Sequence, residues 1–453
     1  MRGWKARHSE DIAQIWLKTP HRLACPRCTL IWIKAGRLTG DKVAADQLTP
    51  ALMQTSLFRS LALLLATSGS LWAANTLGEA IGQGTVSANV RARFEGVHQT
   101  ALRDADAVTL RTRVGYTTAP WQGLKAMVEG EHIVAAKGDK YSQAGLNPAA
   151  TGRAVVGDPE TEEVNQVFLA YTSGKTTATL GRQRIVLDNT RFIGDVGWRQ
   201  NMQTYDAFLV QDKTFDKTTL TYAYLDQVNR VFSARHPQGK WDSDSHALNA
   251  SYTGLPAGTL TGYAYLLDFA KLAAANSCAT YGASFAGTQP LNTDVKVAYR
   301  AELATQSDYG ASTLNYDALY ATVSAGLVGK PGSLTIGYEQ LGSDNNVGFK
   351  TPIATLHAVN GWADLFTATP AAGLQETYLR ATANLPEGFV LTASYHQFKA
   401  DGNGTKFGEE YDAQLTRKFG KYVTGLVKIA NFRRDSLAFP NVQKVWAQVE
   451  FAY

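Results

Sequence analysis

Four arginines fall within one short segment, residues 180–207, and are the side chains of this sequence best suited to bind a ligand: Arg182, Arg184, Arg191 and Arg199. Each guanidinium carries a fixed positive charge and donates two parallel hydrogen bonds in one plane, a geometry that matches a carboxylate. The segment is therefore a candidate binding site for anionic groups.

The same segment contains acidic, amide and aromatic residues that could complete such a site: Asp188, Asn189, Phe192, Asp195, Trp198 and Asp206. The carboxylates could hold the arginines in position, and the aromatic rings offer flat faces for sugars. Alternatively, the Arg–Asp pairs and a buried tryptophan could simply brace the surrounding structure. Both alternatives stay open for Asp188, Asn189 and Trp198, whereas binding is favoured for Arg182, Arg184 and Arg191.

The elements around this segment show the two-residue period of β-strands. In residues 85–95, Val86, Ala88, Val90, Ala92 and Phe94 alternate with Ser87, Asn89, Arg91, Arg93 and Glu95. About eighteen segments have this character, and many carry charge on the second face. In a water-filled barrel the charged face lines the lumen. We therefore expect a basic set in the early strands (Arg91, Arg93, Arg111, Arg113, Lys125) beside a partly acidic set in the late strands (Glu410, Asp412, Glu450). For most of these residues, a solvated wall with cross-strand salt bridges is the favoured alternative to solute binding.

Short and long connections alternate between these strands. Tight Gly- or Pro-containing turns such as 254–258, 329–332 and 384–388 separate longer connections such as 138–162, 184–203 and 343–375. Outer-membrane barrels have short periplasmic turns and long extracellular loops. The pattern predicts an all-β fold, a transmembrane antiparallel up-and-down β-barrel of about 18 strands, with 16 as the alternative. Segment 184–203 is then the third extracellular loop, which in porins often folds inward.

The last nine residues also fit a barrel. Val445, Ala447, Val449, Phe451 and Tyr453 share one face, and the chain ends on an aromatic residue. This strand is expected to close the barrel against the first one, because an unpaired strand edge cannot lie in lipid. It resembles the terminal strand by which outer-membrane proteins are recognised by their assembly machinery. Other aromatic residues are expected to form interfacial girdles, namely Tyr222, Tyr224, Tyr263, Tyr265, Phe269 and Tyr338.

Residues 53–74 have the order of a secretory signal peptide: a basic residue, a short apolar run and small residues at the end. We therefore interpret residues 1–52 as an over-extended N-terminal segment and residues 75–453 as the mature barrel in the bacterial outer membrane. The full chain has a formal net charge of +5. Residues 1–74 contain ten Lys or Arg and four Asp or Glu, so the remainder has 34 basic and 35 acidic residues and a net charge of −1. Nucleic-acid binding is therefore not expected.

Neither an enzyme nor a cofactor protein is indicated. Cys25 and Cys28 have the spacing of half a zinc site, but no second pair follows, so no metal site is expected. Histidines such as His98 and His396 are scattered, and no nucleophile motif flanks them. The chain has no stretch of 18 apolar residues that could form a transmembrane helix.

Segment 180–207 resembles the signature of the alginate export family of outer-membrane porins. The resemblance rests on Gly181-Arg182-Gln183, Asp188-Asn189, Arg191-Phe192-Ile193-Gly194 and Trp198-Arg199-Gln200-Asn201. It implies a monomeric 18-stranded barrel that passes an anionic polyuronate outward. The residues matching this motif would then contact the polymer.

The sequence thus predicts a channel for passive transport of an anionic or polyhydroxylated solute, with export of an alginate-like exopolysaccharide as its sharpest form. The alternative is a general or small-solute-specific uptake porin of the same fold. The expected partners are outer-membrane lipid, an anionic polysaccharide or small anionic solute, and the assembly machinery. No cofactor is expected, and the barrel is expected to be a monomer.

Overall fold

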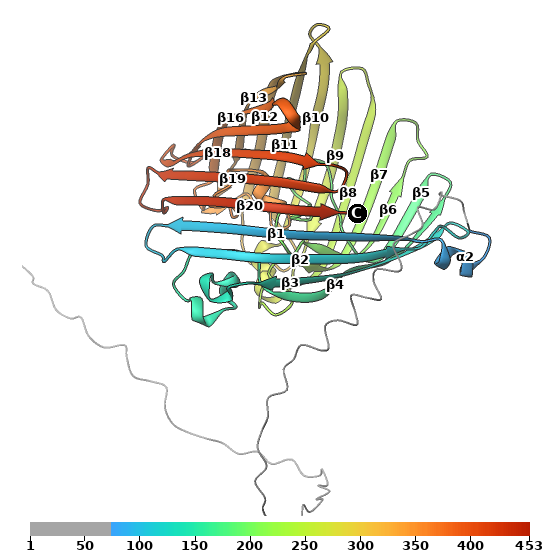
Figure 1. The fold of residues 1–453 in the computed structure, drawn as a ribbon. Helices are drawn as coiled ribbons and strands as arrows, with labels where there is room; N and C mark the ends of the chain where they lie inside the picture. The colour runs from blue at the N-terminus through green and yellow to red at the C-terminus, as the bar shows by residue number, and fades with distance from the viewer. Residues whose placement is uncertain (1–73) are drawn as a thin grey trace, which may run out of the picture. The chain divides into compact units, whose positions relative to one another are not determined.

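The computed structural model describes residues 74–453, so the predicted segment 1–52 and all of the predicted signal peptide except Ala74 lie outside the described residues. Residues 74–453 form an antiparallel barrel of 18 strands (Figure 1). The strands are β1 (Thr85–Gln99), β2 (Ala105–Thr117), β3 (Leu124–Ala135), β4 (Thr161–Ser173), β5 (Thr176–Gln183), β6 (Thr204–Asp212), β7 (Thr218–Asn229), β8 (Lys240–Leu255), β9 (Gly258–Leu267), β10 (Cys278–Pro290), β11 (Val295–Asp308), β12 (Asp317–Gly329), β13 (Gly332–Leu341), β16 (Leu374–Asn384), β17 (Phe389–Lys399), β18 (Lys406–Phe419), β19 (Val423–Arg434) and β20 (Val442–Ala452).

The remaining elements are short. Two-residue strands β14 (Ser343–Asp344) and β15 (Val347–Gly348) pair with each other, and helix α2 (Leu77–Gly82) precedes the first strand. Single 3-10 turns lie at η1 (Gly138–Lys140), η2 (Gln143–Gly145), η3 (Pro148–Ala150), η4 (Lys271–Asn276), η5 (Leu356–Ala358) and η6 (Pro386–Gly388). Among residues 74–453, no helix is both long and apolar enough to cross a membrane.

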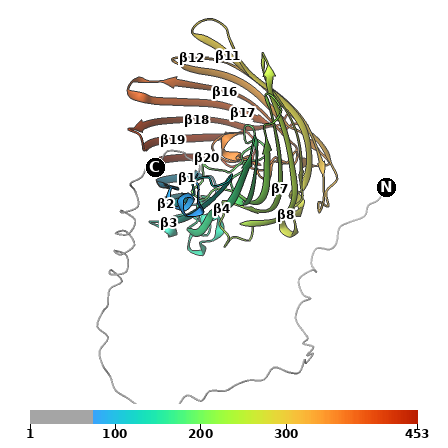
Figure 2. The ribbon, with the colours of Figure 1, turned by 90° about the vertical axis from the view of Figure 1, so that its right-hand side faces the viewer.

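The barrel is closed. Each strand pairs with its sequence neighbour, and β20 pairs antiparallel with β1 from Asn89↔Ala452 to Gln99↔Val442. The two strands lie side by side in Figure 1, red beside blue, and Figure 2 shows the wall continuing through β4, β7 and β8. Closure satisfies the backbone groups that an open sheet edge would leave unpaired in lipid. The predicted 18 strands and the predicted closure are therefore confirmed.

Strand β1 shows why this sequence forms a wall with two different faces. Arg91, Arg93 and Glu95 are buried inside, whereas Ala92 is exposed on the outside and Phe94 is partly exposed there. Successive side chains of a strand point to opposite faces, so one alternating sequence supplies both an apolar outer surface and a charged lumen.

The connections follow the predicted alternation with two exceptions. The turns at residues 174–175, 256–257 and 330–331 are tight, whereas the connections at 136–160, 184–203 and 342–373 are long. The first and the eighth of the connections assigned to the extracellular side, 100–104 and 400–405, are short as well. Two of the long connections, 184–203 and 342–373, contact the lumen face of the wall.

Candidate functional site

The 184–203 loop spans the barrel lumen from wall to wall. Near its start, the Asp188 carboxylate accepts hydrogen bonds from Asn249 Nδ2 of β8 at 2.8 Å and from Tyr265 OH of β9 at 3.4 Å. Near its end, the Gln200 carbonyl accepts from Arg111 and Arg113 of β2 at 3.2 and 3.0 Å. The loop is therefore held on two separate sectors of the wall, and it narrows the space between them.

Arg191 anchors the middle of this loop. Its guanidinium forms a two-pronged ion pair with Glu339 of β13, at 2.9 and 3.1 Å, and donates to Asn360 Oδ1 at 3.1 Å. The Arg191 side chain is 1% exposed. Burial alone would lower its pKa, but Glu339 and Tyr320 raise the pKa above the ordinary arginine value. Arg191 thus stays charged and is already paired, which leaves almost none of its surface for a solute.

Phe192 adds an apolar anchor next to Arg191. Its ring lies 5.3 Å from Tyr263 and Tyr320, and 6.0 Å from Phe349. Tyr263 and Tyr265 stack on each other at 4.8 Å on the lumen side of β9. Aromatic contacts of this kind stabilise beyond the area they bury. These two tyrosines are therefore not part of an interfacial girdle, as the sequence had suggested, and buried Phe269 is not either.

Cations on β1, β2, β19 and β20 form what we call the basic wall: Arg91, Arg93, Arg111, Arg113, Lys428 and Lys444. Arg91 donates to the carbonyls of Gly197, Trp198 and Arg199, at 3.2 to 3.3 Å. Together with the two β2 arginines on Gln200, it holds the end of the loop by its backbone oxygens. The basic set predicted for the early strands is therefore largely covered by the loop.

Each arginine of the basic wall also has a side-chain acceptor. Arg91 and Arg111 lie 3.1 and 3.3 Å from Glu450, and Arg113 pairs with Glu131. Arg93 donates to Gln448 Oε1 at 2.6 and 3.0 Å and lies 3.5 Å from Asp158. Buried charges are stable when paired in this way.

Arg199 links the loop to three other parts of the chain. Its guanidinium bonds Glu95 of β1 and Asp364 of the 342–373 loop at 2.9 Å each, and lies 3.9 Å from Asp158. Burial disfavours the charge, but these three carboxylates raise the Arg199 pKa above its ordinary value. Asp364 also accepts from Lys444 of the basic wall at 2.8 Å.

Trp198 lies between aromatic and cationic groups. Its ring stacks on His357 at 4.5 Å with 4° between the planes, and Arg93 and Lys428 lie 4.1 and 4.2 Å from its centre. A cation over an indole face is stabilising when water is excluded. Trp198 therefore braces two loops against the wall, which is one of the two alternatives left open by the sequence.

His357 is neutral in this network. Its Nδ1 lies 2.7 Å from Asp364 Oδ1, and Lys428 Nζ lies 2.7 Å from its Nε2. Burial lowers the His357 pKa to about 3, with Asp364 opposing and Lys428 adding to the shift. The Nδ1–H then donates to the aspartate while Nε2 accepts from the lysine.

Carboxylates on β13, β16 and β18 form what we call the acidic wall: Glu339, Glu376, Glu410 and Asp412. The carboxylates of this wall accept hydrogen bonds from donor groups of the 342–373 loop and so hold the loop in place. Glu410 accepts from the Ala363 backbone N–H at 2.7 Å, and Asp412 accepts from the Trp362 N–H at 3.3 Å. Asn360 Nδ2 donates to Glu339 and Glu376 at 2.6 Å each.

The two loops also bind each other. The Gly194 N–H donates to the Ile353 carbonyl, and the Thr355 N–H donates to the Thr190 carbonyl, at 3.0 Å each. Gln203 and Tyr205 donate to the Ile353 carbonyl as well, at 3.0 and 3.3 Å. The lumen therefore contains one connected layer made from both loops.

Three of the residues singled out from the sequence are exposed on the 184–203 loop: Arg184, Asp188 and Asn189. In residues 184–188, buried Ile185 and Leu187 alternate with exposed residues. The Arg184 side chain is 50% exposed. Its Nε donates to Asp195 Oδ2 at 2.9 Å. Of the residues singled out on this loop, these three have the most accessible side chains.

Arg182 does not line the lumen. It lies on the same face of β5 as Leu180, which is 62% exposed, and opposite Val167 of β4, which is 49% exposed. Its guanidinium pairs with Asp206 of β6 at 2.6 and 2.9 Å. The expectation that Arg182 contacts a solute in the pore is therefore corrected: it braces the outer face of the wall.

Sequence reasoning missed the acidic residues that hold the loops, above all Glu95, Asp158, Glu339 and Glu376. For the three glutamates the only signal was a carboxylate on the polar face of an alternating strand, which does not reveal its partner, and Asp158 lies in a connection without any such pattern. Among residues 74–453, no group of three or more His, Cys, Asp or Glu side chains is arranged to hold a metal ion.

No family model matches the sequence, and curated proteins give no match either. Solved structures do match. The crystal structure of Acinetobacter baumannii OccAB3 has a TM-score of 0.67 at 15% sequence identity, and the match covers 82% of this chain and 100% of OccAB3. The crystal structure of Acinetobacter baumannii OccAB2 has a TM-score of 0.66 at 14% identity, and the match covers 83% of this chain and 99% of OccAB2. Pseudomonas aeruginosa OccK9 (OpdG) has a TM-score of 0.65 at 16% identity, covering 83% of this chain and all of its own.

These findings correct the resemblance to alginate export porins. The similar structures are outer-membrane porins of the Occ and Opd group, not alginate exporters. The Arg-, Asp- and Trp-rich segment has a different explanation, because its residues fasten a loop inside a charged lumen. The chain is a bacterial outer-membrane β-barrel with the fold of the Occ and Opd porins.

Proposed function

We propose that the barrel is a passive channel for small polar solutes, and that the 184–203 and 342–373 loops form its narrowest part. One observation carries this proposal: the two loops are joined to each other and fastened to the basic and acidic walls across the lumen. A layer of this kind leaves room for small molecules and obstructs polymers. The fold shared with the Occ and Opd porins supports it.

We assign solute contact to Arg184, Asp188 and Asn189. They are exposed on the loop, whereas Arg191, Arg199 and the four arginines of β1 and β2 are largely buried against their protein partners. The exposed set contains both signs of charge and a neutral amide. It suits hydroxyl-bearing or zwitterionic small solutes better than a long polyanion, for which an uninterrupted basic path would be needed. In a passive channel, direction follows the concentration gradient.

Solute permeation tests the proposal directly. Residues 75–453 would be refolded into liposomes, and swelling would be followed in isotonic solutions of solutes from glycerol to oligosaccharides. We expect rapid entry of the smallest solutes and a steep loss of entry with size. Equal entry of a long polyuronate, or no entry of any solute, would refute the proposal.

A pair of arginine variants separates lumen contact from general effects of charge. Arg184→Gln removes the exposed loop cation, so we expect the reversal potential in a salt gradient to move toward cation selectivity. Arg182→Gln is the matched control, because it removes the same charge two residues away on the outer face. Equal shifts in both variants would contradict the assignment of Arg184 to the passage.

A further inference from the structure

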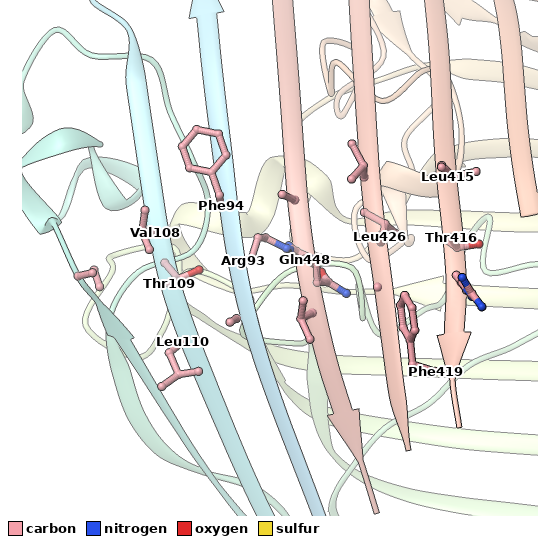
Figure 3. A pocket seen from close by; sticks show the side chains of 18 of the residues that line it. Arg93, Phe94, Val108, Thr109, Leu110, Leu415, Thr416, Phe419, Leu426 and Gln448 are labelled. Carbon is pink, nitrogen blue, oxygen red and sulfur yellow. Dashed lines mark hydrogen bonds between the residues drawn. The ribbon is translucent and has the colours of Figure 1, made fainter. Parts of the chain in front are cut away.

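One well-defined hollow of the described barrel lies on its outer face. It has a volume of about 860 Å³ and extends across β18, β19, β20, β1 and β2 (Figure 3). Arg93 and Gln448 border it only through their backbone, because their side chains bond to each other on the lumen side. This outer groove is therefore unrelated to the passage for solutes.

Small residues form the floor of the outer groove. Ala92, Ala447 and Gly425 come from the three adjacent strands β1, β20 and β19. Phe94 and Phe419 rise at opposite ends, as Figure 3 shows. The Phe419 ring lies against Gly425, where a Cβ would come within 3.0 Å of it. The result is an elongated apolar groove, because the side chains on its floor are smaller than those around it.

A single arginine lies at the periplasmic end of the outer groove. Arg417 lies between Leu415 and Phe419 on the outward face of β18, next to the short turn at residues 420–422. Its guanidinium lies 4.7 and 5.0 Å from the rings of Phe389 and Phe419, and Nη1 is 3.0 Å from Glu387. The Arg417 side chain is 28% exposed, and its contact with Glu387 uses Nη1. Nη2 therefore retains donor capacity at the depth where lipid headgroups lie.

We propose that the outer groove is a binding site for one phospholipid of the periplasmic leaflet. The acyl chains occupy the apolar floor, and the phosphate accepts hydrogen bonds from Arg417. A guanidinium matches the geometry of phosphate oxygens, and rings on both sides hold it in place. Lys421, on the adjoining turn, adds positive charge at the same end. This combination of shape and charge favours a periplasmic phospholipid over another copy of the chain or an outer-leaflet lipopolysaccharide.

Native mass spectrometry of the barrel purified from membranes tests this site. After repeated detergent washing, we expect the wild type to retain one phospholipid. Arg417→Gln should reduce the retained fraction about tenfold, the effect of losing a charge-assisted hydrogen bond. Ala447→Phe should fill the floor and abolish retention.

Two controls keep the test specific. Arg182→Gln removes an arginine from the outer face at the other end of the strands, and Ala283→Phe places a ring on the outer face of β10. Both should retain the phospholipid, and the heat-dependent shift of folded barrels on gels should be unchanged in all four variants. The proposal would be overturned by a wild type without lipid, by equal retention in all variants, by retained lipopolysaccharide, or by a dimer instead of a lipid adduct.

Discussion

The basic and acidic walls of the lumen carry opposite charges, yet each wall holds a loop in place by hydrogen bonds to the loop backbone. On the basic wall, arginines donate to backbone carbonyls of the 184–203 loop, such as that of Gln200. On the acidic wall, Glu410 and Asp412 accept from backbone N–H groups of the 342–373 loop. A peptide segment presents both kinds of group, so either sign of charge can hold it. A charged lumen face therefore need not be a charged path for solutes.

The charged groups of the lumen differ in how they are balanced. Arg113 pairs with Glu131, and Glu339 of the acidic wall pairs with Arg191 of the loop. On the acidic wall, Glu410 and Asp412 lie on the same face of one strand, and His396 lies 3.4 Å from Asp412. Removing a charge should thus cost more where the pairing is one to one than where two like charges adjoin. The predictions below test this difference.

The largest effect is expected at Arg191, the loop cation bound to the acidic wall. Arg191→Met leaves Glu339 buried without its partner, which should lower the free energy of unfolding by about 3–5 kcal/mol. The measurement is thermal unfolding of the refolded barrel, followed by gel mobility. Arg191→Met combined with Glu339→Met should recover most of the loss; if the double variant is as unstable as the single one, the pairing is not the cause.

On the basic wall, Arg113→Gln is expected to cost about 1.5–3 kcal/mol, the range for hydrogen bonds to charged groups. The shorter amide cannot reach both Glu131 and the Gln200 carbonyl, which Arg113 does. Urea-induced unfolding of wild type and variant would give the difference. A change below about 0.5 kcal/mol, the range of ordinary surface substitutions, would show that the loop does not depend on this contact.

Acid should loosen the junction between the loops at His357. Its folded pKa of about 3 lies below the ordinary value of 6.5. The unfolded chain therefore binds the extra proton first, so this contribution to stability is complete above pH 6.5 and is lost as the pH falls toward 3. Single-channel recordings between pH 7 and 4.5 should show growing current noise. His357→Phe, which keeps the ring against Trp198, should suppress that change, whereas His98→Gln at the rim should not.

The smallest effect is expected on the acidic wall. Glu410→Gln keeps an oxygen that can accept the Ala363 N–H and removes a charge next to Asp412. We expect the free energy of unfolding to change by less than about 0.5 kcal/mol. A loss as large as that predicted for Arg113→Gln would remove the proposed difference between one-to-one ion pairs and adjoining like charges.

Much of the barrel could be predicted from the sequence because strand alternation and connection lengths are local signals. The β1 pattern around Arg91 and Phe94, and the terminal strand ending at Tyr453, led directly to a closed barrel of 18 strands. Arg182 shows where local signals fail. Arg182 lies on the same face of β5 as Leu180. The charge of Arg182 suggests that this face lines the lumen, whereas the apolar Leu180 suggests that it faces lipid, so the sequence of this short strand gives conflicting signals.

The candidate site was only partly predictable because its partners are distant in sequence. Arg191 was recognised as a functional candidate, but Glu339 and Asn360, which bind it, lie 148 and 169 residues away. The length of the 342–373 loop was visible, whereas its return into the lumen depends on contacts with both walls. Tyr263 and Tyr265 have the composition of a girdle, yet they occupy the buried alternating positions of β9, where Phe192 packs against them.

We propose that the two fastened loops, and not the barrel wall, set the width of the passage. The most direct test is single-channel conductance of a variant in which residues 353–366 are replaced by a short Gly-Ser linker, with folding checked by gel mobility. We expect a conductance several-fold above wild type and entry of larger solutes into liposomes. A folded variant with wild-type conductance and the same size limit would contradict it.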